Sequence, residues 1–306
     1  MIKTDKKIIF WGTPDFALPG FQTLQQMGLV RAVVTQPDKP AGRNKKTLSS
    51  PIKIEAQKNN LPVLEPEIFN NEFINDLKKY LPATFMIIAY GRIIPDKILK
   101  LSELLALNIH PSQLPLLRGP SPIQTALLKG FKITGISLMQ LDSQMDHGPL
   151  LAQEKIEINP EDNFLTLSKK LTSISQDILA KNVIKYLSNQ LTPLPQDHQQ
   201  ATFCKIIKKE DGRIDWLKPA QEINNQIRAF NPWPSAFFDL NGLNIKIFKA
   251  QITENNLKPA EILIDQDKLI IGTSQKSLEI LELQPAGKKI MRAAEFIRGY
   301  QRYLSQ

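Results

Sequence analysis

The residues of this sequence best suited to chemistry are an amide, an imidazole and a carboxylate: Asn108, His110 and Asp146. Asn108 can offer two N–H donors to a developing oxyanion. His110 can be charged near neutral pH, so it can stabilise the same oxyanion or carry a proton. Asp146 can orient and charge the imidazole, or accept a proton from an attacking group. Together these residue types predict acyl transfer.

Each of the three also has an ordinary structural role open to it. His110 could be a hydrogen-bonded structural histidine, and Asn108 a capping or turn residue. Asp146 could be a turn carboxylate, and Asp142 competes with it for the catalytic role; the tight turn at Gly148 favours Asp146. The position of His110 at the end of an apolar run, just before a proline-bounded turn, favours the catalytic interpretation.

Several other site classes lack their motifs here. Three histidines and the single Cys204 do not provide closely spaced zinc ligands, so no metal is expected. A lone cysteine excludes an internal disulfide and fits a reducing compartment. The first predicted strand leads into residues 12–16 without a G-x-G-x-x-G fingerprint, and no phosphate-binding P-loop motif is present.

Length and charge set wider bounds. A chain of 306 residues is long enough for two domains, and its net charge of +9 weakly favours an anionic partner. No run approaches about 18 apolar residues, so no membrane span is expected. The start of the chain lacks the apolar region of a signal peptide. We therefore expect a cytoplasmic protein.

A basic segment at residues 36–51 is rich in proline, glycine and serine and carries Arg43, Lys45 and Lys46, with Lys53 just beyond it. A loop of about 15 structureless residues is uncommon unless it has a function. The segment could be a mobile, solvated loop or an arm that contacts phosphates. The sequence leaves these two interpretations equal.

The first half of the chain alternates short apolar runs with helical patterns, which predicts a mostly parallel sheet flanked by helices. The expected strands are 7–11, 30–35, 84–89, 104–110 and 132–140, and the expected helices are 14–27, 52–59, 71–81 and 123–130. Ligands bind such sheets outside the carboxyl ends of the strands. Tyr90 and Gly91, like residues 108–110, fall at that edge.

The second half changes character. A long helix is expected over 163–187, followed by a polar, proline-punctuated stretch that is typical of an interdomain linker. A helix over 219–230 and regularly spaced short strands then predict a small OB-like β-barrel. The expected organisation is an α/β, Rossmann-like catalytic domain (1–189), a linker (190–204) and a C-terminal barrel domain (205–306).

Residues 108–115, with Arg118 and Gly119 following, resemble the folate-binding and catalytic signature of the formyltransferases that use 10-formyltetrahydrofolate. Asp146 matches the catalytic aspartate of that family. Further motifs are similar to those of family members that formylate methionyl-tRNA, and they run along nearly the whole chain. These motifs lie at residues 12–17, 36–43, 230–234 and 283–289.

The resemblance implies a function. A formyl group would pass from 10-formyltetrahydrofolate to the α-amine of methionine on initiator tRNA, for translation initiation, without a metal. The implied enzyme is a monomer with folate and initiator methionyl-tRNA as its partners. The expected catalytic residues are Asn108, His110 and Asp146; the expected folate-binding residues are Ser112, Gln113, Leu114, Pro115, Tyr90 and Gly91; the expected tRNA-binding residues are Arg43, Lys45 and Lys46.

The sequence departs from the family pattern at several positions. Gln113 replaces a usual leucine, Leu117 stands where an aromatic is common, and residues 120–121 replace small residues. His147 and Pro149 replace a usual threonine and aspartate. These changes bear on the shape of the folate pocket and leave the three catalytic residues in place.

Three other functions stay open. A formyltransferase for a nucleotide sugar or a purine precursor is disfavoured by the basic segment and the second domain. A non-catalytic RNA-binding protein is disfavoured by the three intact catalytic residues. An α/β oxidoreductase would need to bind a nicotinamide.

Overall fold

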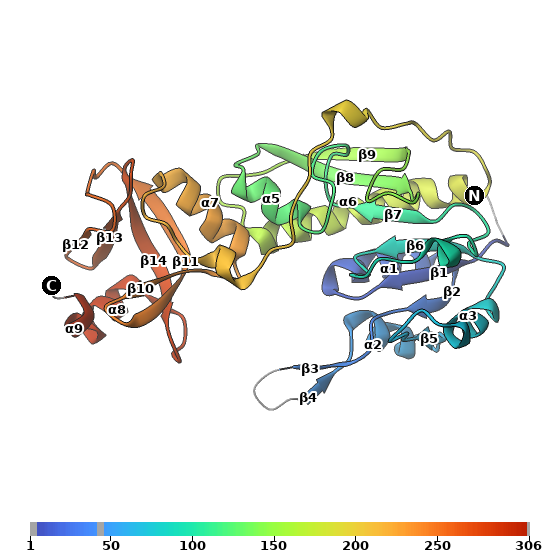
Figure 1. The fold of residues 1–306 in the computed structure, drawn as a ribbon, viewed down its shortest axis with the longest axis horizontal. Coiled ribbons are helices and arrows are strands. Elements are labelled where there is room, and N and C mark those ends of the chain that lie inside the picture. Colours follow the sequence, from blue (N-terminus) through green and yellow to red (C-terminus); the bar gives the residue numbers. More distant parts are fainter. Residues whose placement is uncertain (1–4, 42–45, 305–306) are drawn as a thin grey trace. The chain divides into compact units, whose positions relative to one another are not determined.

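The computed structural model describes residues 5–41 and 46–304, and for residues 39–41 and 46–47 it describes the backbone alone. The chain divides into two compact units, and each contains segments that are far apart in the sequence (Figure 1). Unit 1 comprises Met1–Pro120, Thr134–Ile156 and Ser168–Phe203; unit 2 comprises Ser121–Ile133, Glu157–Leu167 and Cys204–Gln306.

Unit 1 is built on a seven-stranded sheet with the order β5-β2-β1-β6-β7-β8-β9. The pairs β1–β2, β1–β6, β2–β5 and β6–β7 are parallel, and β7–β8 is antiparallel. The mostly parallel α/β prediction is therefore confirmed. The strands are β1 Ile8–Gly12, β2 Val30–Val34, β5 Val63–Leu64, β6 Thr84–Ile88, β7 Leu107–His110, β8 Ile133–Gln140 and β9 Leu150–Glu157.

The central strands form because their sequences suit burial on both faces. Every residue of β1 and β6 is buried, as expected for near-continuous apolar runs in a parallel sheet. The helices and the small β3–β4 ribbon around this sheet are η1 Asp15–Ala17, α1 Leu18–Gln26, β3 Lys39–Ala41, β4 Lys46–Leu48, α2 Pro51–Lys58, α3 Asn71–Lys78, α4 Asp96–Leu99, α6 Phe164–Leu187 and η2 His198–Gln200.

Close packing brings α1 against both the sheet and α6. A Cβ at Gly20 of α1 would lie 2.6 Å from Ile88 of β6 and 3.2 Å from Leu179 of α6, so the absence of a side chain permits this approach. Helix α2 begins at Pro51 behind the N-cap Ser50, whose hydroxyl accepts a hydrogen bond from the Lys53 N–H.

Unit 2 contains an antiparallel sheet with the order β10-β11-β14-β13-β12, and β15 pairs with β14. Its core includes Ile223 and Ile227 of α7 and Phe296 of α8, which are almost fully buried. The elements are α5 Pro122–Leu128, η3 Lys209–Gly212, α7 Ala220–Phe230, β10 Ala236–Leu240, β11 Leu243–Thr253, β12 Ile262–Asp265, β13 Lys268–Gly272, β14 Ser277–Pro285, β15 Met291–Arg292, α8 Ala293–Gly299 and α9 Gln301–Leu304.

The antiparallel second region is as expected, while closure of its strands into a barrel stays a prediction. Strand β9 and the C-terminal helices α8 and α9 were not among the expected elements. The strand expected over 104–110 begins only at Leu107. Among the described residues, no helix is both long and apolar enough to cross a membrane.

Candidate active site

Strand β7 places the amide and the imidazole on one face of the sheet. Side chains alternate along a strand, so Asn108 and His110 point to one side while Leu107 and Ile109 point to the other. His110 is only 4% exposed, and Asn108 is half-buried. Both therefore lie on the site side of the strand, near its carboxyl end.

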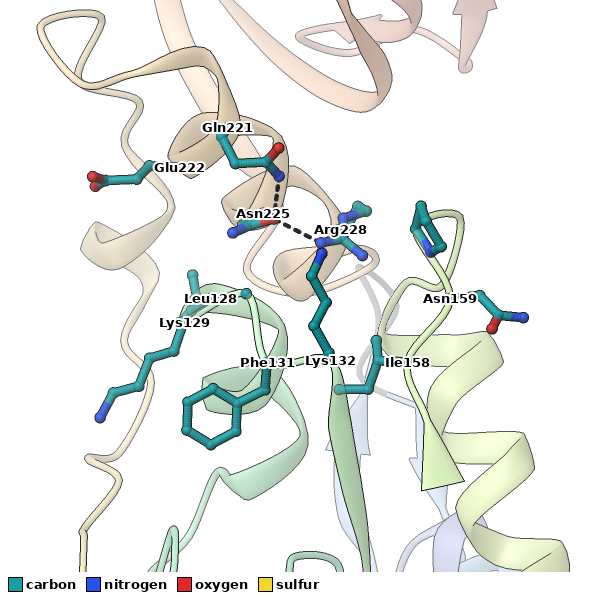
Figure 2. A pocket seen from close by; sticks show the side chains of 12 residues that line it. Leu128, Lys129, Phe131, Lys132, Ile158, Asn159, Gln221, Glu222, Asn225 and Arg228 are labelled. Carbon is teal, nitrogen blue, oxygen red and sulfur yellow. Dashed lines mark hydrogen bonds between the residues drawn. The ribbon is translucent and has the colours of Figure 1, made fainter. Parts of the chain in front are cut away.

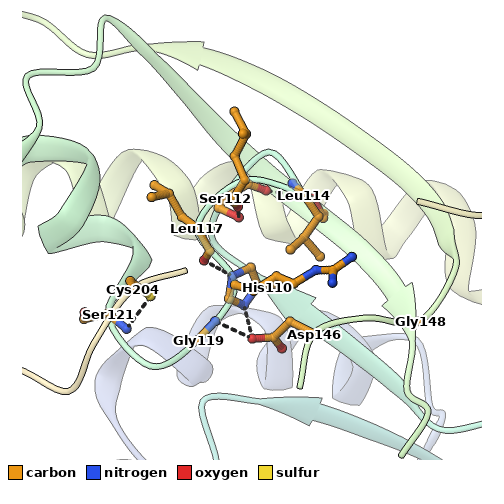
Figure 3. A network of polar contacts seen from close by, with 12 residues as sticks. His110, Ser112, Leu114, Leu117, Gly119, Ser121, Asp146, Gly148 and Cys204 are labelled. Carbon is orange, nitrogen blue, oxygen red and sulfur yellow. Dashed lines mark hydrogen bonds and ion pairs between the residues drawn. The ribbon is translucent and has the colours of Figure 1, made fainter. Parts of the chain in front are cut away.

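The structure brings Asp146 to His110. His110 Nδ1 lies 3.6 Å from Asp146 Oδ2, and the same carboxylate oxygen accepts a hydrogen bond of 2.8 Å from the Gly119 N–H (Figure 3). His110 Nε2 is 2.9 Å from the Leu117 carbonyl oxygen. A carbonyl only accepts, so Nε2 must carry a hydrogen. This leaves Nδ1, facing the carboxylate, as the nitrogen that can gain or lose a proton.

The competing carboxylate, Asp142, points elsewhere. Its Oδ2 lies 2.6 Å from His147 Nδ1, and its Oδ1 accepts a hydrogen bond from the Gln144 N–H. The two carboxylates of this loop thus engage two different histidines, and Asp146 is the one that faces His110.

The loop that carries Asp146 has a constrained backbone. Asp146 adopts a left-handed conformation with φ of 50°, which is uncommon for a residue other than glycine. A Cβ at Gly148 would lie 2.1 Å from the Gln140 carbonyl oxygen, so only glycine fits there. The Gln196 amide donates to the Asp146 and Gly148 carbonyls at 3.0 and 2.7 Å.

The turn over residues 112–115 is held from within. Ser112 is fully buried, and its hydroxyl donates to the Leu116 carbonyl at 2.6 Å. The Ser137 hydroxyl donates to the Ser112 carbonyl and accepts from the Leu114 N–H. The Gln153 amide donates to the Leu114 carbonyl at 2.8 Å. The polar groups of this turn are therefore largely engaged with the protein.

Gln113 is also engaged within the protein. Its Nε2 donates to the Glu154 carbonyl at 3.0 Å. A Cβ at Gly135 would lie 2.2 Å from Gln113 Nε2, so this amide packs where Gly135 leaves space. The amide anchors the turn to the neighbouring strands β8 and β9.

Tyr90 and Gly91 follow β6, and the Tyr90 carbonyl is hydrogen-bonded to residues that follow β1 and β2. The Tyr90 carbonyl accepts hydrogen bonds from Thr13 Oγ1 at 3.0 Å and from Gln36 Nε2 at 2.8 Å. The Tyr90 ring is buried against Trp11, with ring centroids 5.2 Å apart, and burial raises the pKa of its hydroxyl while Arg92 opposes the shift. Gly91 has φ of 81°, and a Cβ there would meet Gln36. These residues shape the sheet edge next to β7.

Sequence comparison agrees with this geometry. A model of the formyl transferase family matches residues 6–183, and a model of the formyl transferase C-terminal domain matches residues 206–301. The chain belongs to the formyltransferase family. It is 42% identical to a methionyl-tRNA formyltransferase from Thermodesulfovibrio yellowstonii over 95% of each chain. It is 39% identical to that of Myxococcus xanthus, over 96% of this chain and 95% of the relative.

Solved structures share the fold. An N-formyltransferase from Helicobacter canadensis, in complex with folinic acid and dTDP-3-aminofucose, superposes with a TM-score of 0.69 at 21% identity, over 90% of this chain and 98% of the other. HypX from Aquifex aeolicus, in complex with tetrahydrofolic acid, gives a TM-score of 0.65 at 17% identity, over 99% of this chain and 48% of the other. At these identities the match shows the fold alone.

In this formyltransferase, the stretch expected to be a linker also contributes to the site. The Thr202 hydroxyl accepts a hydrogen bond of 2.9 Å from the Leu117 N–H, and the Thr202 carbonyl accepts one of 2.9 Å from the Arg118 N–H. Gln196 is buried and accepts two hydrogen bonds from Arg118 at 2.7 and 3.2 Å. Neither Gln196 nor Thr202 was expected at the site, because a polar, proline-rich composition carries no sign of a long-range contact.

The basic segment is described only at its base. Arg43 and Lys45 lie outside the described residues, and Lys46 is described by its backbone alone, in β4. Lys53 lies between Asp38 at 2.9 Å and Glu65 at 2.8 Å, and hydrogen bonds to these carboxylates raise its pKa. Its charge is thus balanced within the protein.

A cavity of about 640 Å³ lies in unit 2, away from the predicted site residues (Figure 2). Arg228 lies in its wall and donates to the Asp162 carbonyl at 2.9 Å and to Asn225 Oδ1 at 2.6 Å. Burial lowers the pKa of Arg228, and the nearby Asp162 and Glu161 carboxylates oppose that shift. This basic residue of the cavity therefore has acidic neighbours. Among the described residues, no group of three or more metal-ligating side chains occurs.

Proposed function

We propose that this chain transfers a formyl group from 10-formyltetrahydrofolate to the α-amine of methionine on initiator tRNA. The main support is the pairing of His110 with Asp146 beside Asn108, at a sheet edge, in a chain similar along its length to methionyl-tRNA formyltransferases. Neighbours of the same fold, crystallised with folates, support a formyl-folate donor.

The proposed reaction is a direct transfer. The neutral α-amine attacks the formyl carbon, and α-amino groups titrate near neutral pH, so a neutral fraction is available. A new C–N bond forms, the bond from the formyl carbon to the folate nitrogen breaks, and one proton passes from the amine to that nitrogen. The tetrahedral intermediate carries an oxyanion, which needs hydrogen-bond donors in a site with little water.

We assign these roles to three residues. Asn108 Nδ2 and protonated His110 donate to the oxyanion. Asp146, at 3.6 Å, favours the protonated form of His110 and helps the proton reach the leaving nitrogen. The distance is longer than a hydrogen bond, so the Nδ1–H is not held by the carboxylate, and a small tilt of the ring would direct it to the substrate.

The folate would lie against residues 112–115 and against Tyr90 and Gly91. The polar groups of Ser112 and Leu114 are engaged with the protein, so this turn would contribute a rigid wall more than hydrogen bonds. We assign Gln113 and Pro115 to the same wall. Gly91 has no side chain, which leaves room for the Gln36 amide at the adjacent edge.

The tRNA would be held by charge. Arg43, Lys45 and Lys46 would contact phosphates of the acceptor arm, and a C-terminal domain over 205–306 would follow the RNA backbone. The catalytic domain would span 1–189, with 190–204 as the connection. We propose that the enzyme is a monomer. We also propose that it is cytoplasmic, because charged initiator tRNA is made and used in the cytoplasm.

The test is a formyl-transfer assay with 10-formyltetrahydrofolate and charged initiator tRNA. We expect turnover in the wild type and a loss of about 10²- to 10³-fold in Asn108→Ala and His110→Ala, as for other preorganised donors. Amino sugar nucleotides and purine precursors serve as alternative acceptors. Transfer to one of these in preference to tRNA, or RNA binding with no transfer at all, would reject the proposal.

A further inference from the structure

Two further histidines, His147 and His198, form a pair close to the proposed catalytic pair of His110 and Asp146. The rings of His147 and His198 are stacked, with centroids 3.9 Å apart and planes at 4° to each other. His147 follows Asp146 in the loop, whereas His198 belongs to the stretch expected to be a linker. The stack therefore joins two segments that are distant in sequence.

Hydrogen bonds extend this stack at both ends. On one side, His147 Nδ1 lies 2.6 Å from Asp142 Oδ2. On the other, an Arg118 nitrogen lies 2.8 Å from His198 Nδ1. Arg118 also donates to Gln196, whose own amide donates to the Asp146 and Gly148 carbonyls. These contacts form a closed circuit around the Asp146 loop, here called the histidine latch: Asp142, His147, His198, Arg118 and Gln196.

The hydrogen-bond chemistry fixes the protonation of His198. A guanidinium has donors and no acceptor, so His198 Nδ1 must accept, and the ring is neutral with its hydrogen on Nε2. The groups facing the ring are His147, Arg118, Asp142 and Asp197. Loss of hydration, then the charges of His147 and Arg118, lower the pKa of His198, against the two carboxylates. The latch thus closes with neutral His198.

Asp146 needs such support. Its left-handed backbone conformation costs some free energy, although less for aspartate than for most non-glycine residues, and neighbouring contacts help to maintain it. Its carboxylate must also stay within reach of His110, at 3.6 Å. A shift of about 1 Å in a catalytic group can cost about a hundredfold in rate.

We propose that His147 and His198 are positioning residues, whose stack holds the Asp146 loop against residues 196–198 and so keeps Asp146 at His110. This goes beyond the proposed function, on which its kinetic readout depends.

The kinetic test compares three substitutions of one residue. His198→Ala removes both the stack and the acceptor for Arg118; His198→Phe keeps a ring to stack; His198→Gln keeps an acceptor. We expect kcat to fall about tenfold or more in His198→Ala, with little change in KM for tRNA or folate. We expect the phenylalanine and glutamine variants to recover part of the loss.

Gln199→Ala is the matched control, because Gln199 is the exposed neighbour of His198 and its side chain lies outside the latch. It should behave as the wild type. A His198→Ala enzyme with wild-type kcat would overturn the proposal, even if its melting temperature fell. So would equal losses in all three variants with a parallel rise in KM, since that would indicate general disruption.

A second measurement does not depend on activity. The chain has three histidines, so ¹⁵N imidazole spectra of the whole protein contain few signals, and substitution can assign them. We expect His198 Nδ1 to be unprotonated at pH 7, and the His110 signals to shift in His198→Ala and not in Gln199→Ala. Unchanged His110 signals would reject the latch. If the wild type formylates no tRNA, the proposed function fails while these spectra still decide the latch.

Discussion

Two ion-pair arrangements in unit 1 differ in what they leave free. At the base of the basic segment, Lys53 lies 2.9 and 2.8 Å from Asp38 and Glu65, so one permanent cation meets two carboxylates. In the site, His110 meets one carboxylate, Asp146, at 3.6 Å. The Lys53 ammonium is therefore paired with carboxylates of the protein itself. The imidazole has one carboxylate partner at a distance longer than a hydrogen bond, so its Nδ1 edge is not fully satisfied within the protein.

The largest expected effect separates the two carboxylates of the Asp146 loop. Asp146→Asn should lower kcat by about a hundredfold or more, because the neutral amide no longer favours protonated His110. Asp142→Asn should cost less, since it weakens only the latch. Single-turnover formyl transfer at saturating folate measures both. Equal losses would mean that the two carboxylates cannot be told apart by role.

A smaller effect is expected at the lysine pair. Lys53→Met keeps much of the side-chain volume and leaves the Asp38 and Glu65 carboxylates facing each other. We expect the free energy of unfolding in urea to fall by about 1–2 kcal/mol, and KM for tRNA to rise severalfold with kcat retained. Lys58→Ala is the control, because Lys58 is 67% exposed and pairs with Glu55 of its own helix. A large fall in kcat in Lys53→Met would contradict a purely structural role for Lys53.

The basic segment itself should respond to salt. Replacing Arg43, Lys45 and Lys46 by alanine should reduce the dependence of log Kd on log salt for initiator tRNA. The expected reduction is roughly 0.7–0.9 for each phosphate that these side chains neutralise. The kcat at saturating tRNA should stay near the wild-type value. An unchanged slope would show that these cations do not meet phosphates.

The smallest effect is a pH dependence of stability. The pKa of His198 is lowered in the folded protein. Below pH 6.5, the unfolded chain therefore binds a proton at His198 more readily than the folded chain does. Stability due to this group is present above the ordinary value of 6.5 and is lost as the pH falls below it. Melting temperatures of wild type and His198→Gln should therefore begin to converge as the pH falls below 6.5, and converge further until the pH passes the lowered pKa of folded His198. A constant difference would contradict neutral His198.

Much of unit 1 was predictable because local sequence decides it. The buried runs of β1 and β6 are apolar throughout, and the shared side of Asn108 and His110 follows from simple alternation along β7. Strand β9 was not predicted, since it is half-exposed and its sequence mixes polar and apolar residues without a strong period. Local sequence alone was therefore enough to predict β1, β6 and the shared side of Asn108 and His110.

The latch could not be predicted for a different reason. His198, Gln196 and Thr202 meet the site through contacts with residues 50 to 85 positions away. A single sequence gives no measure of which distant polar residues meet. The preference for Asp146 over Asp142 rested on a nearby glycine, and the structure supplies a better reason, namely the 3.6 Å approach to His110.

The division of the chain into units has a consequence for synthesis. Residues Ser121–Ile133 and Glu157–Leu167 belong to the same unit as Cys204–Gln306, and α5 packs on α7. The partner of α5 therefore emerges from the ribosome about a hundred residues after α5 itself. A nascent chain that stalls before α7 would expose the buried apolar face of α5, which includes Ile123 and Leu127. Truncated products should accordingly be prone to aggregation and proteolysis. This holds even though a chain that ends before α7 includes every residue assigned to catalysis.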